Sequence, residues 1–195
     1  MEEIQATKAE FRSQIAKALD DFGDTVLAEK NRRIEKRLFD FANFLEANIV
    51  LLYTHGDHQV QTSEIIQRSF QFGKILVLPA FKPDSREMVL LKIDHFPADL
   101  AVGRRGVLEP ISSRCKQVPI ELVDIAIVPG LVFDEKGGRI GTGLGYYDRF
   151  IPKLAITTRK VSLAYEAQLV PQVPMEPHDK FVDIIITEER VIYKI

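Results

Sequence analysis

Apolar residues recur at steps of three or four positions through the first 46 residues, which predicts amphipathic helices. The first stretch is marked by Ile4, Phe11, Ile15 and Leu19. A second stretch with the same period covers residues 27–46. The chain is therefore expected to begin with two helices, each with one apolar face for a core.

From residue 49 onward the period changes to short continuous apolar runs, which are typical of strands buried on both faces. Runs at 49–53 and 75–78 flank a helical stretch that starts at an N-cap, Thr62, and stops at Gly73, and Pro79 is expected to close the second run. This strand–helix–strand order predicts a βαβ unit in a mainly parallel sheet. Further strands are expected at 88–93, 123–128, 160–165, 181–187 and, at an edge, 190–195.

No repeat, low-complexity tract or linker interrupts the 195 residues, and roughly 100–200 residues is the usual size of one domain. Because 46% of the residues are apolar, the chain has enough material for a core, which excludes intrinsic disorder. We therefore expect one α/β layered domain over residues 1–195, with the helices of 1–46 packed on its α/β core.

The charge balance argues against a dedicated nucleic-acid binder, because 26 basic and 28 acidic residues give a net charge of −2. The second helix does carry a basic face, but acidic residues are interleaved with it. A solvated helix face is therefore favoured over an RNA-binding one. The basic residues of this face are Arg32, Arg33, Lys36 and Arg37.

Other sequence features bound the compartment and the partners. No secretory signal is evident, and the apolar runs are far shorter than the ~18 residues of a membrane span. The single Cys115 excludes an internal disulfide and a multi-cysteine zinc site, fits a reducing compartment, and is expected to be an inert thiol. We expect a cytoplasmic protein with no membrane and no nucleic-acid partner.

The segment most informative about chemistry is a glycine-rich stretch directly after the strand expected at 123–128. Gly141, Gly143 and Gly145 alternate in one short loop, so backbone N–H groups can converge on a phosphate. Arg139 can add a bidentate contact, and a helical pattern after Gly145 would point its N-terminus at the same anion. The alternative is a tight turn without a ligand. The spacing matches neither a Walker A loop nor a Rossmann fingerprint.

Asp148 is the last residue of this stretch. Beside a polyphosphate it would be a natural ligand for magnesium. The alternative is that it is an acidic residue that stabilises a helix N-terminus. The order Pro-Gly-x-x-Phe-Asp at 129–134, then Gly-x-Arg-x-Gly-x-Gly-x-Gly-Tyr-Tyr-Asp at 137–148, resembles the 5-formyltetrahydrofolate cyclo-ligase family. The resemblance extends over most of the chain. Further matching positions are Lys8 and Arg12, residues 62–66, Gly73-Lys74, residues 106–110, His178-Asp179 and residues 182–188.

The resemblance implies a three-layer α/β/α fold similar to the phosphosugar-isomerase and CoA-transferase group. It also implies an ATP- and Mg²⁺-dependent ligase that converts 5-formyltetrahydrofolate to 5,10-methenyltetrahydrofolate, by phosphorylation of the formyl oxygen and ring closure by N10, with release of ADP and phosphate. Such a protein would act on small molecules as a monomer or weak homodimer.

The resemblance also implies roles for particular residues. Arg139 and Tyr147 would be catalytic, and Asp148 and Asp179 would hold magnesium. The folate would contact Gln59 and the loop residues Thr142, Gly143, Leu144, Gly145 and Tyr146. ATP would be held by Lys8, Arg12, Arg139, Ile140, Gly141, Thr142, Gly143, Leu144, Gly145, Tyr146 and Tyr147.

One departure concerns Gln59 and Gln61, which stand where the family usually has acidic residues. A carboxylate accepts two hydrogen bonds side by side, whereas an amide offers one acceptor and one donor. Three interpretations are open: the protein binds folate less tightly, a neighbouring residue compensates, or the protein is a diverged paralogue that keeps the ATP site but takes another ligand.

Nearby, His55 and His58 could suggest a metal site. Because no third ligand is evident, these histidines are interpreted as surface polar residues.

Overall fold

Eight strands form one mixed sheet in the computed structural model, which describes residues 2–82 and 84–194. The expected domain limits at residues 1 and 195 lie outside these described residues. The helices are α1 (Glu2–Asp20), α2 (Asp24–Phe39), α3 (Ala42–Glu46), α4 (Ser63–Gln71) and α5 (Tyr146–Phe150), with short 3₁₀ turns η1 (Ile120–Leu122), η2 (Ile151–Lys153) and η3 (Glu166–Gln168).

The strand order of the large sheet is β12-β11-β10-β7-β1-β2-β3-β6, and its five central strands, from β11 to β2, are parallel. Antiparallel strands complete both edges. The strands are β1 (Ile49–Leu51), β2 (Ile75–Lys82), β3 (Glu87–Ile93), β4 (Leu100–Val102), β5 (Leu108–Pro110), β6 (Lys116–Val118), β7 (Ile125–Ile127), β8 (Val132–Phe133), β9 (Arg139–Ile140), β10 (Arg159–Leu163), β11 (Ile184–Ile186) and β12 (Val191–Tyr193).

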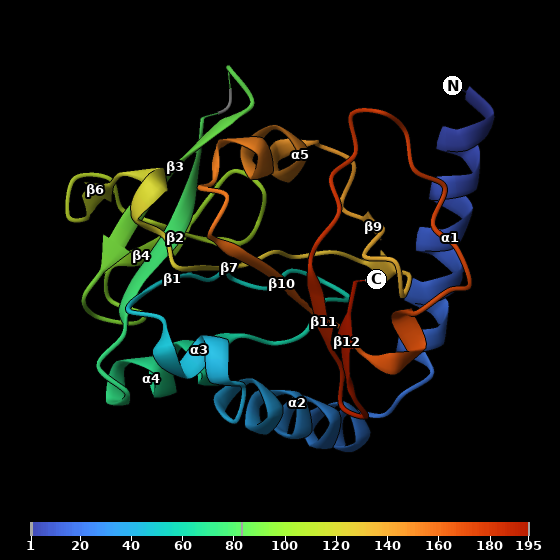
Figure 1. Cartoon of the computed structure of the whole chain (residues 1–195), viewed down its shortest axis with the longest axis horizontal. Helices are drawn as coiled ribbons and strands as arrows, with labels where there is room; N and C mark the ends of the chain where they lie inside the picture. Colours follow the sequence, from blue (N-terminus) through green and yellow to red (C-terminus); the bar gives the residue numbers. More distant parts are fainter. Residues whose placement is uncertain (1, 83, 195) are drawn as a thin grey trace.

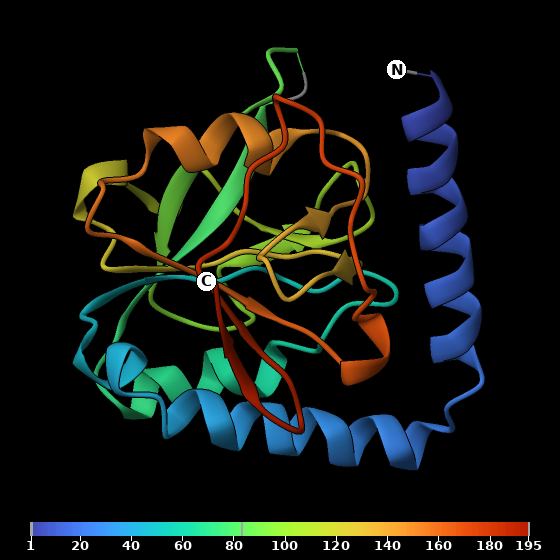
Figure 2. The same cartoon turned by 45° about the vertical axis from the view of Figure 1, so that its right-hand side comes forward.

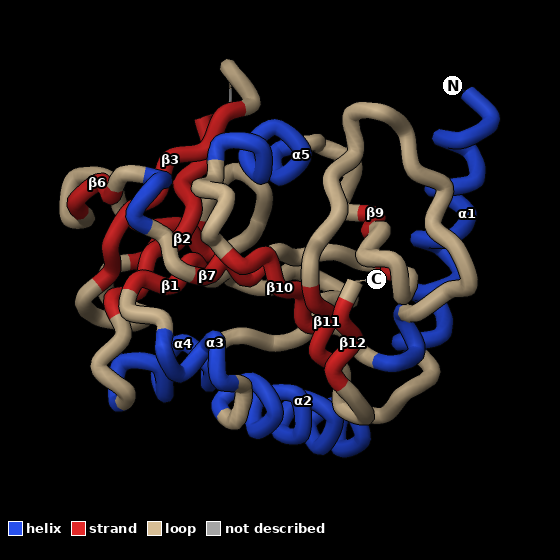
Figure 3. Tube along the Cα trace, viewed as in Figure 1, coloured by secondary structure: helices blue, strands red, loops and turns tan. Residues whose placement is uncertain are grey.

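Helices cover the sheet on both faces, which confirms the layered α/β fold (Figures 1 and 3). Along β1, Val50 packs in the core on one face and Leu51 in the core on the other, since side chains alternate along a strand. Burial on both faces is the reason that these strands read as continuous apolar runs. In the turned view of Figure 2, α1 runs upright at one side of the molecule and α2 runs across below the sheet.

The predicted βαβ unit is confirmed, because β1 and β2 are parallel neighbours joined through α4. Gly73 ends that helix at φ +67°, as expected. Thr62 occupies the N-cap position, but its side chain does not cap the helix. Its hydroxyl donates instead to the carbonyl oxygen of Tyr53 at 2.6 Å and ties the helix start to the loop after β1.

Two predicted boundaries were wrong. The second helix is broken at Asp40, where Phe41 adopts an extended backbone. On a continuous helix positions 39 and 41 would point about 160° apart, and the break allows Phe39 and Phe41 both to be buried. Strand β2 continues through Pro79 to Lys82, because pairing with β1 ends at Val77 and the missing N–H of Pro79 therefore costs no hydrogen bond on that side.

The last two strands are shorter than expected: the 181–187 run contributes β11 and the 190–195 run contributes the antiparallel edge strand β12. Residue 195 is outside the described part. Within residues 2–82 and 84–194, no helix is both long and apolar enough to span a membrane.

Candidate active site

A cavity of about 1690 Å³ lies where loops leave the carboxyl ends of β1, β7 and β10. Its wall includes every residue that the sequence suggested for ATP, folate or metal, although these come from positions 8 to 179. Of the described residues that line it, seven are Lys or Arg and four are Asp. The protein as a whole carries a net charge of −2, so the lining of this cavity has an excess of positive charge that the whole chain lacks.

The glycine-rich loop follows the hairpin β8–β9 and forms one side of the cavity. Gly143 and Gly145 have φ of +97° and +69°, a region in which side chains with a Cβ are strained. In the described part of the chain, the backbone N–H groups of residues 142–145 donate to no protein acceptor. These amides are free to bind a ligand, as a phosphate nest requires.

The hairpin that carries this loop is held by Asp134, the last residue of the Pro-Gly-x-x-Phe-Asp sequence. Its buried carboxylate accepts hydrogen bonds from the backbone N–H groups of Lys136 (2.9 Å), Gly138 (2.9 Å) and Val173 (2.7 Å). Gly137 turns at φ +82° where a Cβ would lie 2.2 Å from the carbonyl oxygen of Val182. Asp134 and Gly137 are therefore structural: they fix the loop and do not line the cavity, whereas Pro129 and Leu131 of the same motif do.

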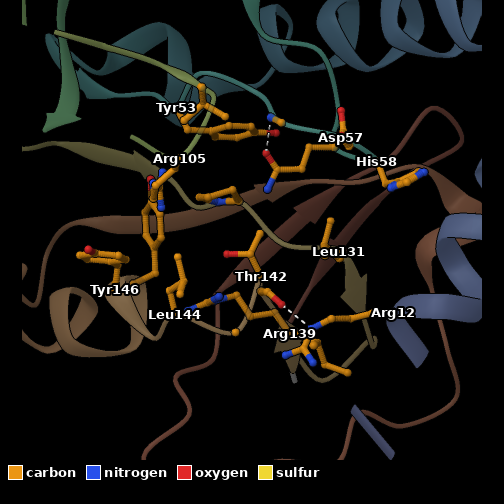
Figure 4. A pocket seen from close by; sticks show the side chains of 18 of the residues that line it. Arg12, Tyr53, Asp57, His58, Arg105, Leu131, Arg139, Thr142, Leu144 and Tyr146 are labelled. Atoms are coloured by element: carbon orange, nitrogen blue, oxygen red, sulfur yellow. Dashed lines mark hydrogen bonds between the residues drawn. The ribbon is translucent and has the colours of Figure 1, made fainter. Parts of the chain in front are cut away.

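Helix α1 brings two cations to the cavity. Arg12 donates from Nε to the carbonyl oxygen of Gly141 at 2.8 Å (Figure 4). Lys8 is buried and donates from Nζ to Glu176 (2.9 Å) and Asp179 (2.5 Å). Burial lowers the pKa of Lys8, but the hydrogen bonds to Asp179 and Glu176 outweigh burial, so the net pKa is raised and the ammonium stays charged.

Arg139 and Asp148 form a further ion pair of the cavity wall, with a fully buried guanidinium and 2.8 Å between Nη2 and Oδ1. Burial lowers the pKa of Arg139, and Asp148 opposes that shift, so the guanidinium remains a cation. Among the described side chains, the buried polar atoms without a hydrogen-bond partner are Arg139 Nε and the Tyr147 hydroxyl. Both belong to residues that line the cavity, which makes them candidates for ligand contacts.

The expected metal residues lie near each other but are occupied by protein cations. Asp148 Oδ1 accepts from Arg139 and from the backbone N–H of Lys180 at 3.0 Å, which places it beside Asp179. In the described chain, the carboxylate and imidazole group with metal-ligand spacing is Glu176, His178 and Asp179. Sequence reasoning missed Glu176, because an acidic residue in a proline-rich loop carries no signal of its own.

The opposite side of the cavity is aromatic and cationic; of its residues the sequence singled out Tyr146 but not Phe81 or Arg105. Tyr146 packs edge-on against Phe81, with ring centroids 4.8 Å apart. The Cζ atom of Arg105 lies 3.4 Å from the centroid of Phe81 and 5.4 Å from that of Tyr146. Figure 4 shows Arg105 and Arg12 approaching the cavity from opposite sides. A long ligand with an anionic end and a flat ring fits between them.

Comparison with known proteins gives a match over nearly the whole chain: residues 4–188 fit the model of the 5-formyltetrahydrofolate cyclo-ligase family. The chain belongs to this family. Its resemblance to the family's motifs is thereby confirmed, and relatives and structural neighbours carry the names of ligases of this type.

An Aquifex aeolicus structure, named 5,10-methenyltetrahydrofolate synthetase, is 30% identical, with a TM-score of 0.82 over 95% of this chain and 92% of that one. The Escherichia coli K12 5-formyltetrahydrofolate cyclo-ligase is 27% identical over 84% of this chain and 90% of its own length. The Saccharomyces cerevisiae 5-formyltetrahydrofolate cyclo-ligase is 28% identical over 96% of this chain and 98% of its own length.

Other family positions in this cyclo-ligase-family chain are structural. Lys74 is buried and donates to the carbonyl oxygens of Phe44 (2.7 Å), Leu45 (2.7 Å) and Ala47 (2.6 Å), which would otherwise be unpaired at the end of α3. The basic face of α2 is also engaged in part: Arg37 donates to carbonyl oxygens at residues 187–189, and Lys36 pairs with Asp40. These contacts favour the solvated-face interpretation over RNA binding.

The two histidines after β1 have separate partners. His58 Nε2 lies 2.8 Å from Asp20 Oδ1, at the protein surface. His55 Nδ1 accepts from the backbone N–H of Thr62 at 3.2 Å. Each histidine is thus engaged with a different element, and they form no metal site together with other described residues. Gln59, the departure from the family pattern, lines the same wall as His55.

Proposed function

We propose that this protein is an ATP-dependent 5-formyltetrahydrofolate cyclo-ligase that forms 5,10-methenyltetrahydrofolate, ADP and phosphate. Membership of the family supports this activity. The observation that carries the nucleotide half is the pair of buried, unpartnered donors, Arg139 Nε and the Tyr147 hydroxyl, beside the free amides of residues 142–145. Such groups are costly to bury unless a ligand completes their hydrogen bonds.

The nucleotide phosphates would lie against residues 142–145, between Arg12 on one side and Arg139 below. The link from Arg12 to Gly141 holds α1 against the loop, so the cations are preorganised before ATP arrives. Lys8 is bound by two carboxylates, and it is close enough to contribute charge while they keep it in place. Arg139 and Tyr147 would contact the transferring phosphoryl group, where charge builds up during transfer.

Magnesium fits the carboxylates beside this loop, since Mg²⁺ prefers oxygen ligands and keeps several waters. Asp148 and Asp179 would hold it. Both carboxylates are paired with protein cations, Asp179 with Lys8 and Asp148 with Arg139, so the ion would share them with these cations. When bound, Mg²⁺ supplies charge that neutralises phosphate oxygens. Asp148 and Asp179 would orient the ion, while Arg139 and Lys8 retain part of their interactions with these carboxylates.

The folate would lie against Tyr146, Phe81 and Arg105, with the reacting end toward the glycine-rich loop. A stacked ring fixes the position of the formyl group next to the phosphates. The formyl oxygen attacks the γ-phosphorus, and the bond to the β–γ bridging oxygen breaks to release ADP. N10 then attacks the activated carbon, its proton is lost, and the C–O bond to phosphate breaks as the ring closes.

The test is the ultraviolet absorbance of the methenyl product after mixing the protein, 5-formyltetrahydrofolate, Mg²⁺ and ATP. We expect the absorbance to rise only when ATP is present. A second arm replaces ATP by a nonhydrolysable analogue as the control for phosphoryl transfer. No ATP-dependent change at high protein concentration contradicts the proposal.

A second candidate is a diverged paralogue that keeps the nucleotide site and takes another ligand. The observation in its favour is Gln59, whose Oε1 accepts from Gly56 N–H at 2.9 Å. This amide cannot reproduce the paired acceptors of a carboxylate. Calorimetry that detects ATP binding without binding of 5-formyltetrahydrofolate supports the paralogue.

A further inference from the structure

Among the side chains that the loop between β1 and α4 brings to the cavity, those of His55 and Gln59 have acceptor atoms that are already taken by the backbone. Gln59 Oε1 accepts from Gly56 N–H at 2.9 Å. A backbone N–H needs an acceptor, so this contact fixes which end of the amide is oxygen. The NH₂ group of Gln59 is therefore the end left for a ligand. In the described structure it has no protein acceptor.

His55 is held in the same sense. Its Nδ1 accepts from the backbone N–H of Thr62 at 3.2 Å, while the Thr62 hydroxyl gives its own proton to the carbonyl oxygen of Tyr53. Because Nδ1 is an acceptor, the neutral ring carries its proton on Nε2. Burial also lowers the pKa of His55, which favours this neutral form at neutral pH.

His55 Nε2 has no hydrogen-bond partner in the described residues, and it is absent from their fully buried unpaired atoms. This nitrogen is therefore not fully buried, and its N–H has no acceptor within the described protein. His55 lines both the large cavity and an adjoining one of about 160 Å³. The side chain of Arg105, which also lines the cavity, carries donors only. The side chains of His55, Gln59 and Arg105 therefore offer a ligand donors and no free acceptor.

We propose that His55 and Gln59 form a donor-only wall that determines which edge of the ligand is recognised: an edge with acceptor atoms, not one with N–H groups. This inference rests on the proposed function. For 5-formyltetrahydrofolate the matching group is the ring carbonyl oxygen, and the amino edge of the ring faces away from His55 and Gln59. The two side chains are specificity-determining residues and take no part in phosphoryl transfer.

Gln59→Glu is the decisive substitution, because one carboxylate oxygen still accepts from Gly56 and the other replaces the donor. We expect the KM for 5-formyltetrahydrofolate to rise about tenfold, with the KM for ATP and the unfolding midpoint unchanged. Gln59→Met removes the donor without adding charge and is expected to raise the same KM less. The matched control is Gln67→Glu, an exposed glutamine on α4. An unchanged or lower folate KM in Gln59→Glu overturns the proposal.

A second measurement needs no ligand. Long-range ¹H–¹⁵N spectra of the ligand-free protein report which imidazole nitrogen carries the proton, and the His55→Gln variant assigns the signal. We expect the proton of His55 on Nε2 at neutral pH; a proton on Nδ1, or on both nitrogens, overturns the donor assignment. A wild-type protein without ATP-dependent turnover would reject the proposed function, while this spectrum would still decide the state of the wall.

Discussion

Arg12 Nε donates to the carbonyl oxygen of Gly141 at 2.8 Å, across 129 positions of sequence. The bond joins the first helix to the glycine-rich loop and leaves the Arg12 terminal nitrogens near Gly143, where a Cβ would come within 3.7 Å of Nη2. One side chain thus holds the loop and offers charge to whatever the loop binds. The relationship explains why α1, which stands at the edge of the fold, belongs to the site.

Replacing Arg12 by lysine should separate these two roles. Lysine keeps the positive charge but cannot donate to Gly141 and reach the ligand in the same geometry. We expect the KM for ATP to rise about tenfold while the KM for the folate stays within a factor of two. Steady-state kinetics check this, with Arg33→Ala on the exposed face of α2 as the control. An unchanged KM for ATP would show that the link to Gly141 is dispensable.

Asp148→Ala should lower stability as well as activity, because it leaves the buried Arg139 without its counter-charge. Breaking a buried pair from one side costs about 3–5 kcal/mol. We expect Arg139→Met combined with Asp148→Ala to recover part of that loss, although both proteins should lack turnover. Urea unfolding of the wild type, both single variants and the double variant gives the coupling energy. Strict additivity of the two losses is the outcome that contradicts this account.

Lys74→Met should destabilise the protein without changing either KM. Three carbonyl oxygens at the end of α3 lose a charged donor. We expect the free energy of unfolding to fall by about 2–4 kcal/mol. Unfolding by urea measures the change in stability, and steady-state kinetics with each substrate varied in turn measure the two KM values. Lys136→Met, at an exposed position, is the control and should alter stability by less than about 0.5 kcal/mol.

The cluster of Lys8, Glu176 and Asp179 should make stability depend on acid. Burial raises the pKa of Asp179, but hydrogen bonds from Lys8 and the Glu176 backbone overcome this and hold it below its ordinary value. A hydrogen bond from Lys8 likewise lowers the pKa of Glu176. The two carboxylates therefore contribute fully to stability above the pKa values of the unfolded chain, about 4. This contribution is lost as the pH falls through their lower pKa values in the folded protein.

The check is the free energy of unfolding of wild type and Lys8→Met between about pH 7 and pH 3. We expect the difference between them to shrink toward the acid end, because protonated carboxylates no longer need the ammonium. Lys153→Met, which removes an exposed pair with Glu87, should show no such trend. A constant difference across the range would mean that Lys8 acts through packing alone.

Much of the fold could be predicted because burial on both faces leaves a direct trace in the sequence: Val50 and Leu51 are both apolar since each meets a different core. The glycine-rich loop could be found because positive φ at Gly143 and Gly145 restricts the residue type. The end of β2 was predicted wrongly at Pro79. Proline interrupts a strand only where its missing N–H would have bonded to the next strand, and pairing with β1 has already ended at Val77.

The rest of the site depends on distant segments meeting, and single positions do not record that. Glu176 reaches Lys8 across 168 positions, and Arg105 reaches the rings of Phe81 and Tyr146 only once the sheet has formed. Asp134 was grouped with the ligand motif, yet its partners are all backbone amides of the protein. The sequence motif therefore contains both structural residues and residues that line the cavity, and only the fold distinguishes them.

The turn after β1 is anchored at its base, where the Thr54 hydroxyl donates to the Leu108 carbonyl at 2.5 Å, and across its own width by the side chain of residue 59. Its other contacts run to Asp20, Asn31 and Gln168 and not to the glycine-rich loop. A change confined to residues 55–61 would therefore leave Arg12, Arg139 and the free amides of residues 142–145 in place, so the two sides of the cavity can diverge independently.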